Sequence, residues 1–84
     1  MASLDGAPAY CAWRAGAASP PFTWVLLDGE YRELARLGGL DATELPLEPE
    51  LREHFVAGQT YHWFVVGQAF GRPLGSLMES VEIR

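Results

Sequence analysis

The sequence contains a single cysteine, no lysine and only two histidines among its 84 residues. One cysteine excludes an internal disulfide and a cysteine-based metal cluster. All six basic residues are arginines, whereas eleven residues are acidic, and the formal net charge is −5. Because a field of this sign repels phosphate backbones, we expect no nucleic-acid partner.

Long hydrophobic runs are also absent. No stretch reaches the ~20 apolar residues of a membrane helix, and Met1 to Pro8 has neither the basic start nor the apolar centre of an export signal. We therefore expect no direct membrane insertion and no export signal in this chain. Its compartment stays open, since the chain is either a protein in its own right or a domain cut from a longer, exported one.

Apolar residues make up 49% of the sequence and include three Trp, three Tyr and four Phe. Such a chain can bury enough surface to offset the entropy of ordering it, so we expect a globular fold. The length suffices for one domain spanning residues 1–84, which buries only about 60–65% of the surface of the unfolded chain. Every large apolar side chain is then needed in the core.

The clearest strand signal is Thr60 to Gly67, T-Y-H-W-F-V-V-G, which is almost entirely aromatic or β-branched. Shorter runs of the same kind are Ala9 to Arg14 and Phe22 to Leu27, and Leu77 to Arg84 alternates like a half-buried last strand. Thr43 to Leu47 is predicted as an edge strand, because Pro46 cannot donate a ladder hydrogen bond.

The connections between the strands are predicted from the positions of glycine, proline and aspartate. Asp28-Gly29 favours a tight hairpin whose two central residues both have positive φ. Glu30 to Leu37 fits a returning strand better than the helix that Tyr31, Leu34 and Leu37 would also allow. Pro49 to Phe55 fits one helical turn beginning at Pro49. Three segments are predicted as loops or turns, namely 15–21, 38–42 and 69–76.

Short strands with turn signals between them indicate a small antiparallel β-sandwich of about six strands. The pattern Phe55-x-x-Gly58-x-x-Tyr61-x-Trp63-x-Val65, with Trp13 before it and Val81-x-Ile83 after it, resembles immunoglobulin-like and fibronectin type III-like domains of the bacterial type. The resemblance implies that the Tyr61 hydroxyl bonds to the backbone upstream. It also implies an extracytoplasmic parent protein.

The chain departs from that pattern in two places. Trp63 stands where the disulfide cysteine of an immunoglobulin domain would be, so Cys11 is predicted to be an inert core residue. Residues 1–8 are too short and polar for a full first strand, and we expect a disordered or loosely attached segment there. The smaller sheet would then hold little more than the Ala9 and Thr43 strands, which leaves an edge open.

Alternation divides the two best strands into two faces. Phe22, Trp24 and Leu26 share one face of their strand, and Tyr61, Trp63 and Val65 share one face of theirs, so both sets are predicted to point into the sandwich. The opposite faces form the candidate partner-binding patch, which consists of Val25, Leu27, His62, Phe64 and Val66. Three interpretations stay open: an interface, cover by the chain's own Glu30 to Leu37 segment or tail, and an uncovered face selected by β-propensity.

No combination of residues predicts chemistry. His54 and His62 have no cysteine or carboxylate cluster at metal-ligand spacing, and Ser76 and Ser80 lie in no nucleophile motif. The acidic residues from Glu44 to Glu53 fit a solvated surface. We therefore expect no catalytic residue, metal or cofactor, and predict a non-catalytic module that binds a neighbouring domain, a second copy or a partner protein. The alternative is a carbohydrate-binding module that stacks sugars on Trp24 or Tyr31.

Overall fold

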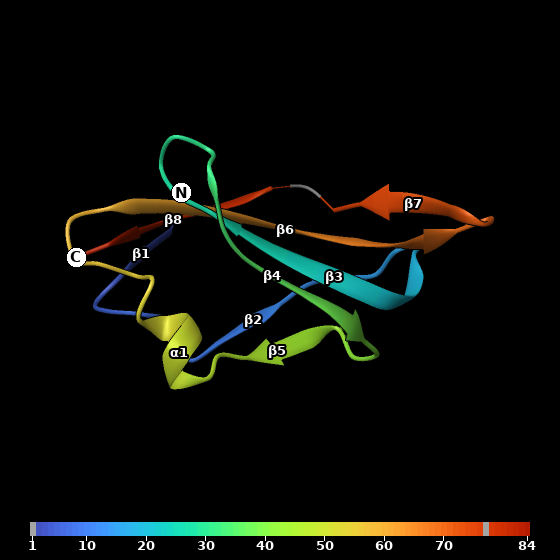
Figure 1. Ribbon diagram of the computed structural model, residues 1–84, viewed down its shortest axis with the longest axis horizontal. Helices are drawn as coiled ribbons and strands as arrows, with labels where there is room; N and C mark the ends of the chain where they lie inside the picture. The colour runs from blue at the N-terminus through green and yellow to red at the C-terminus, as the bar shows by residue number, and fades with distance from the viewer. Residues whose placement is uncertain (1, 77) are drawn as a thin grey trace.

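The structure is a computed structural model that describes residues 2–76 and 78–84. In these residues the chain forms eight strands and one short helix (Figure 1). The elements, in chain order, are β1 (Ala2–Leu4), β2 (Tyr10–Ala12), β3 (Ser19–Leu27), β4 (Glu33–Leu40), β5 (Glu44–Pro46), α1 (Pro49–Arg52), β6 (Thr60–Ala69), β7 (Arg72–Gly75) and β8 (Glu79–Ile83).

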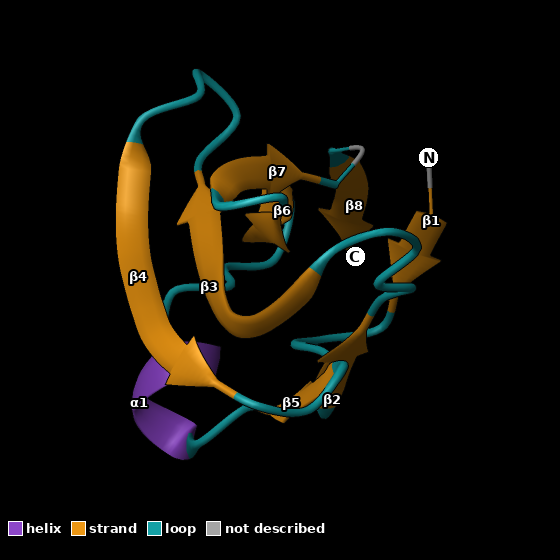
Figure 2. Ribbon diagram, turned by 90° about the vertical axis from the view of Figure 1, so that its right-hand side faces the viewer, coloured by secondary structure: helices purple, strands orange, loops and turns teal. Residues whose placement is uncertain are grey.

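The strands form two sheets that enclose the core (Figure 2). The larger sheet has the order β1-β8-β6-β3-β4. β8 pairs with the first part of β6, and β7 pairs with its last part, from Val66 to Ala69. The smaller sheet contains β2 and β5 alone, as predicted. All pairings are antiparallel except that of β1 with β8. The predicted all-β class is confirmed, with more strands than the six expected.

The inward faces of β3 and β6 build the core. Phe22, Trp24 and Leu26 are buried from β3, and Tyr61 and Val65 from β6. The opposite side of the core is formed by Cys11 of β2 and Leu45 of β5. Leu47, which follows β5, and Phe55, which follows α1, complete it. The predicted division of the two strands into an inward and an outward face is therefore confirmed. Trp13 and Trp63 pack at the margin of this core and are half-buried.

The hydrogen bond implied for Tyr61 is present. Its hydroxyl accepts the backbone N–H of Val56 at 2.8 Å, five residues upstream. The ring packs against Phe55 with a centroid separation of 5.0 Å. Together these contacts fix the path of the chain from α1, which begins at Pro49 as predicted, into β6.

Cys11, on β2 of the smaller sheet, is a free thiol buried in the core. Burial raises the pKa of the thiol to about 11, outweighing the opposite effect of the neighbouring Trp24 side chain. The reactive thiolate is therefore scarce near neutral pH. This agrees with the prediction of an inert core residue.

Four local predictions were wrong. The chain does not turn at 38–42, because β4 continues to Leu40, which pairs with Phe22 and packs on the core. Residues 69–76 contain β7 rather than a loop alone. The segment predicted to be loosely attached includes β1, where the Leu4 carbonyl accepts the N–H of Arg84 at 2.8 Å. In the predicted last strand, Leu77 lies outside the described residues.

The fourth error concerns the tight turn. The connection between β3 and β4 is a longer loop spanning 28–32, in which Tyr31 has a φ of 64°. The two-residue turn with two positive φ angles lies instead at Phe70 (52°) and Gly71 (74°), between Ala69 and its partner Arg72. This is the φ pattern of a type I′ hairpin turn.

Gly67 of β6 lies in close contact with the core beneath it. A methyl group at this position would lie 2.8 Å from Cε1 of Phe22 and 2.9 Å from Cβ of Ala18. We expect Gly67→Ala to lower the free energy of unfolding by about 1–3 kcal/mol through overpacking. Urea titration followed by circular dichroism measures this. Gly75→Ala is the matched control, because in the described chain no atom lies within 4 Å of the added methyl; equal losses from both variants would contradict the explanation.

Candidate interaction surface

The register of β3 and β6 brings the five predicted patch residues together on the outer face of the larger sheet. Val25 lies opposite Phe64, Leu27 lies opposite His62, and Val66 lies opposite Thr23. Residues directly opposite each other in an antiparallel pair share a face. The five side chains therefore form one group, called here the outer patch.

The outer patch is more deeply buried than its sequence suggests. Val25 is 1% exposed, Leu27 8% and His62 7%, whereas Phe64 and Val66 are half-buried. Val25 lies between Phe64 on one side and Arg36 of β4 on the other, so long side chains flank it across both neighbouring strands. The surface that the patch offers to another molecule consists mainly of Phe64 and Val66.

The chain itself covers the His62 end of the patch. The ring of Tyr31, from the loop between β3 and β4, stacks on the imidazole with a centroid separation of 4.4 Å and an interplanar angle of 11°. On β8, Ser80 lies beside His62, and its hydroxyl oxygen is 2.7 Å from Nδ1. Cover by the Glu30 to Leu37 segment is therefore confirmed for His62.

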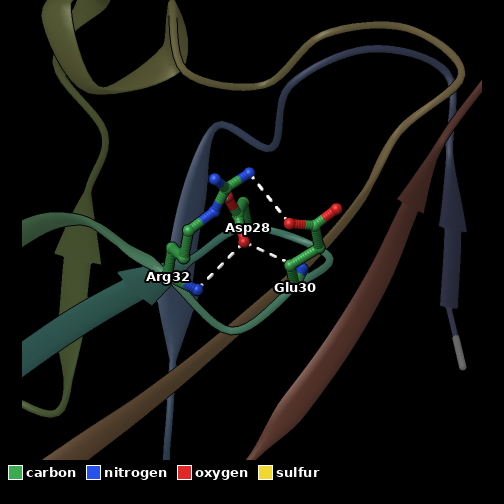
Figure 3. Close-up of polar contacts among 3 residues, drawn as sticks. All are labelled: Asp28, Glu30 and Arg32. Carbon is green, nitrogen blue, oxygen red and sulfur yellow. Dashed lines mark hydrogen bonds and ion pairs between the residues drawn. The ribbon is translucent and has the colours of Figure 1, made fainter.

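A clasp of polar contacts around Asp28 fixes the loop that carries Tyr31 (Figure 3). The Asp28 carboxylate accepts the backbone N–H of Glu30 at 2.8 Å and that of Arg32 at 2.9 Å. The Arg32 guanidinium bridges Asp28 and Glu30, each at 3.0 Å. The pKa of Asp28 is lowered, first by the N–H of Arg32, so the carboxylate that holds the loop persists to lower pH than that of a free aspartate.

The structure also shows which of the two aromatic residues proposed to stack on sugars is exposed. Trp24 is 0% exposed and forms the centre of the core, so it is excluded as a platform. Tyr31 is 61% exposed, with one ring face on His62. Of the two candidates, only Tyr31 can meet a ligand in this structure.

Metal ligation and membrane insertion are two further features that a functional site could show. No group of three or more His, Cys, Asp or Glu side chains placed to hold a metal ion occurs among residues 2–76 and 78–84. In the same part of the chain, no helix has the length and apolar character needed to cross a membrane.

Sequence reasoning missed two further surface features. One is Phe70, which is fully exposed at the turn between β6 and β7. The other is a groove lined by Trp13 and the residues around it after β2, by Trp63 of β6, and by residues of β7 and the start of β8. Both features depend on β7, which was predicted as a loop. Gly71 in the turn is the only local sequence signal for the hairpin of β6 and β7.

Comparison of the chain with protein-family models, with curated proteins and with solved structures finds no match.

Proposed function

We propose that this protein is a non-catalytic interaction module that binds a partner protein through the outer patch, with Phe64 and Val66 as the contact residues. The observation that carries the proposal is that these two apolar side chains remain partly exposed in the middle of the larger sheet. An antiparallel sheet with a solvated face usually alternates with polar residues there. β6 instead presents His62, Phe64 and Val66 in succession.

We further propose that the fold is of the immunoglobulin-like or fibronectin type III-like kind. Two features support this finer assignment. The sheet order β8-β6-β3-β4 faces a smaller sheet containing β2 and β5, and the Tyr61 hydroxyl bonds to the backbone before its strand as in a tyrosine corner. Domains of this type often serve as binding modules of exported proteins, which agrees with the proposed role.

The rigidity of the outer patch favours binding. Val25, opposite Phe64, and Leu27, opposite His62, are already buried within the patch, so they have little side-chain freedom left to lose when a partner binds. Apolar anchors at the centre of a contact generally dominate its free energy. Phe64 is the natural anchor, since it is aromatic and lies opposite the buried Val25.

The test is Phe64→Lys in an affinity capture from cells that make the protein. We expect the variant to stay folded and to lose on the order of 30-fold or more in partner affinity, the effect of removing one interface hot spot. Val56→Lys is the matched control, because Val56 is also an exposed apolar residue but lies before β6 and outside the patch. Equal capture by wild type, Phe64→Lys and Val56→Lys would overturn the proposal.

A carbohydrate-binding module is the second candidate, and the exposed ring of Tyr31 is the observation that favours it. Aromatic rings stack on the apolar faces of sugars, and this ring is held in place by the clasp around Asp28. A glycan array with wild type and Tyr31→Ala decides between the candidates. If Tyr31→Ala abolishes glycan binding and Phe64→Lys leaves it intact, the result would favour the carbohydrate-binding module.

A further inference from the structure

Phe70 is the most exposed large apolar residue described in the structure, with its side chain 100% accessible. It occupies the turn of the hairpin formed by β6 and β7, which extends beyond the rest of the molecule at the right-hand end of Figure 1. A single exposed apolar residue is ordinary on a protein surface. Phe70 combines this full exposure with an uncommon backbone conformation.

The φ of Phe70 is 52°, in the left-handed region. Glycine adopts this conformation freely and asparagine adopts it with less strain than other residues, whereas a bulky residue there is uncommon. Hairpin turns of this kind accordingly favour Asn-Gly and Asp-Gly. A phenylalanine at the first of these positions therefore opposes local stability, and strained residues of this sort are concentrated at functional sites.

A groove suited to an aromatic ring lies on the same molecule. It has a volume of about 530 Å³ and runs between the segment after β2 and the strands β7 and β8. Trp13, Trp63 and Leu74 give it apolar walls, together with small residues such as Ala15 and Ala17. The two indoles meet edge to face with centroids 6.4 Å apart. Ligand-binding clefts in proteins are commonly ~300–1,000 Å³ and mostly apolar.

Phe70 cannot fill the groove of its own chain. Leu74, the nearest groove residue along β7, lies four positions after Phe70, and an extended chain covers about 13 Å over that distance. The hairpin also directs its turn away from the body of the molecule (Figure 1). Any insertion of this ring into this groove is therefore intermolecular.

Charge favours a second copy as the occupant. Arg72 is the only charged residue between positions 64 and 78, so the hairpin that carries Phe70 is locally basic. Glu79 is exposed and lines the groove, although Arg14 also lies there. An incoming hairpin would bring Arg72, two residues beyond Phe70, toward Glu79 of the copy that receives it.

We propose that two copies of this chain associate by inserting Phe70 of each into the Trp13 and Trp63 groove of the other, with Arg72 near Glu79 across the contact. The same strand, β7, follows the turn that carries Phe70 and lines the groove through Leu74 and Gly75, so one two-fold axis beside β7 lets each copy act as donor and acceptor. This surface is distinct from the outer patch, and the inference does not depend on the proposed function.

The first test is sedimentation equilibrium of wild type and Phe70→Asn from micromolar to millimolar concentration. Asparagine removes the ring and suits the left-handed backbone, so the variant should be at least as stable as wild type. We expect its dimerisation constant to fall on the order of 30-fold or more, as for the loss of an aromatic hot spot. Val56→Asn and Phe64→Lys should dimerise like wild type. A monomeric wild type, or equal dimerisation of wild type and Phe70→Asn, would overturn the proposal.

A charge exchange tests the pairing of the two surfaces. Arg72→Glu and Glu79→Arg should each weaken dimerisation several-fold in low salt, and the double variant should recover most of the loss. Losses that add in the double variant would contradict the pairing. The rival reading is a lipid surface, so flotation with phosphatidylcholine and mixed phosphatidylserine vesicles is run in parallel. Phe70-dependent flotation of a protein that stays monomeric would replace the second copy with a membrane.

Discussion

Replacing Trp24 with alanine is expected to remove most of the stability of this domain. Trp24 is 0% exposed and lies at the centre of the core between Phe22 and Leu26 on β3. Truncating a buried aromatic side chain of this size costs about 3–5 kcal/mol. A chain of this length has a total unfolding free energy of roughly 4–13 kcal/mol. We therefore expect Trp24→Ala to be largely unfolded at physiological temperature, as measured by thermal and urea unfolding.

Trp24→Phe is the control that separates core volume from general intolerance to change. It keeps an apolar ring and should lose clearly less stability than the alanine variant. The same comparison at Tyr31, where the ring is largely exposed, should show little difference between alanine and phenylalanine. A cooperative Trp24→Ala domain with wild-type stability would contradict the core described here.

The second large effect is expected at Val25, on the outer face. Val25→Glu would place a carboxylate where 1% of the side chain is exposed. Arg36 lies opposite, but its guanidinium already binds Glu33 at 2.7 Å. An uncompensated buried charge lowers the free energy of unfolding by about 3 kcal/mol or more. We expect this variant to unfold at a much lower urea concentration than wild type.

Val66→Glu provides the comparison for Val25→Glu. Val66 belongs to the same outer patch but is half-buried, so its carboxylate can reach water and the loss of stability should be clearly smaller. The pair shows that the outer patch has a structural part and an exposed part. Equal losses at the two positions would mean that the patch is uniformly exposed or uniformly buried.

The core could be predicted from sequence because alternation determines it. Period-2 geometry in Phe22 to Leu27 and Thr60 to Gly67 assigns each residue to a face regardless of the register between strands. The inward residues Trp24, Leu26, Tyr61 and Val65 follow directly. The tyrosine corner was accessible for a similar reason, since it depends on a local spacing around Tyr61.

Burial within the outer patch could not be predicted in the same way. It depends on which residues lie across from Val25 and His62, and register is a property of strand pairing that a single strand does not encode. The cover of His62 by Tyr31 also needs the Asp28 clasp. Asp28-Gly29 fits a two-residue turn by composition, but the side chain of Asp28 instead bonds to two backbone N–H groups further on and stabilises a longer loop.

The hairpin of β6 and β7 was missed because its turn breaks the usual preference. Phe70 occupies a position where asparagine or glycine is expected, and Pro73 weakens the strand signal of β7. Places where local sequence preference and structure disagree are often functional. This agrees with the proposal that Phe70 serves binding rather than folding.

Site-specific photo-crosslinking tests the central claim, that the outward residues of β6 form an interface while its inward residues hold the fold. A photoreactive phenylalanine analogue at position 64, introduced in cells that make the protein, is predicted to give one discrete partner adduct. The same analogue at position 56, exposed but outside the outer patch, is predicted to give none. No adduct from position 64, or the same adducts from both positions, would contradict the account.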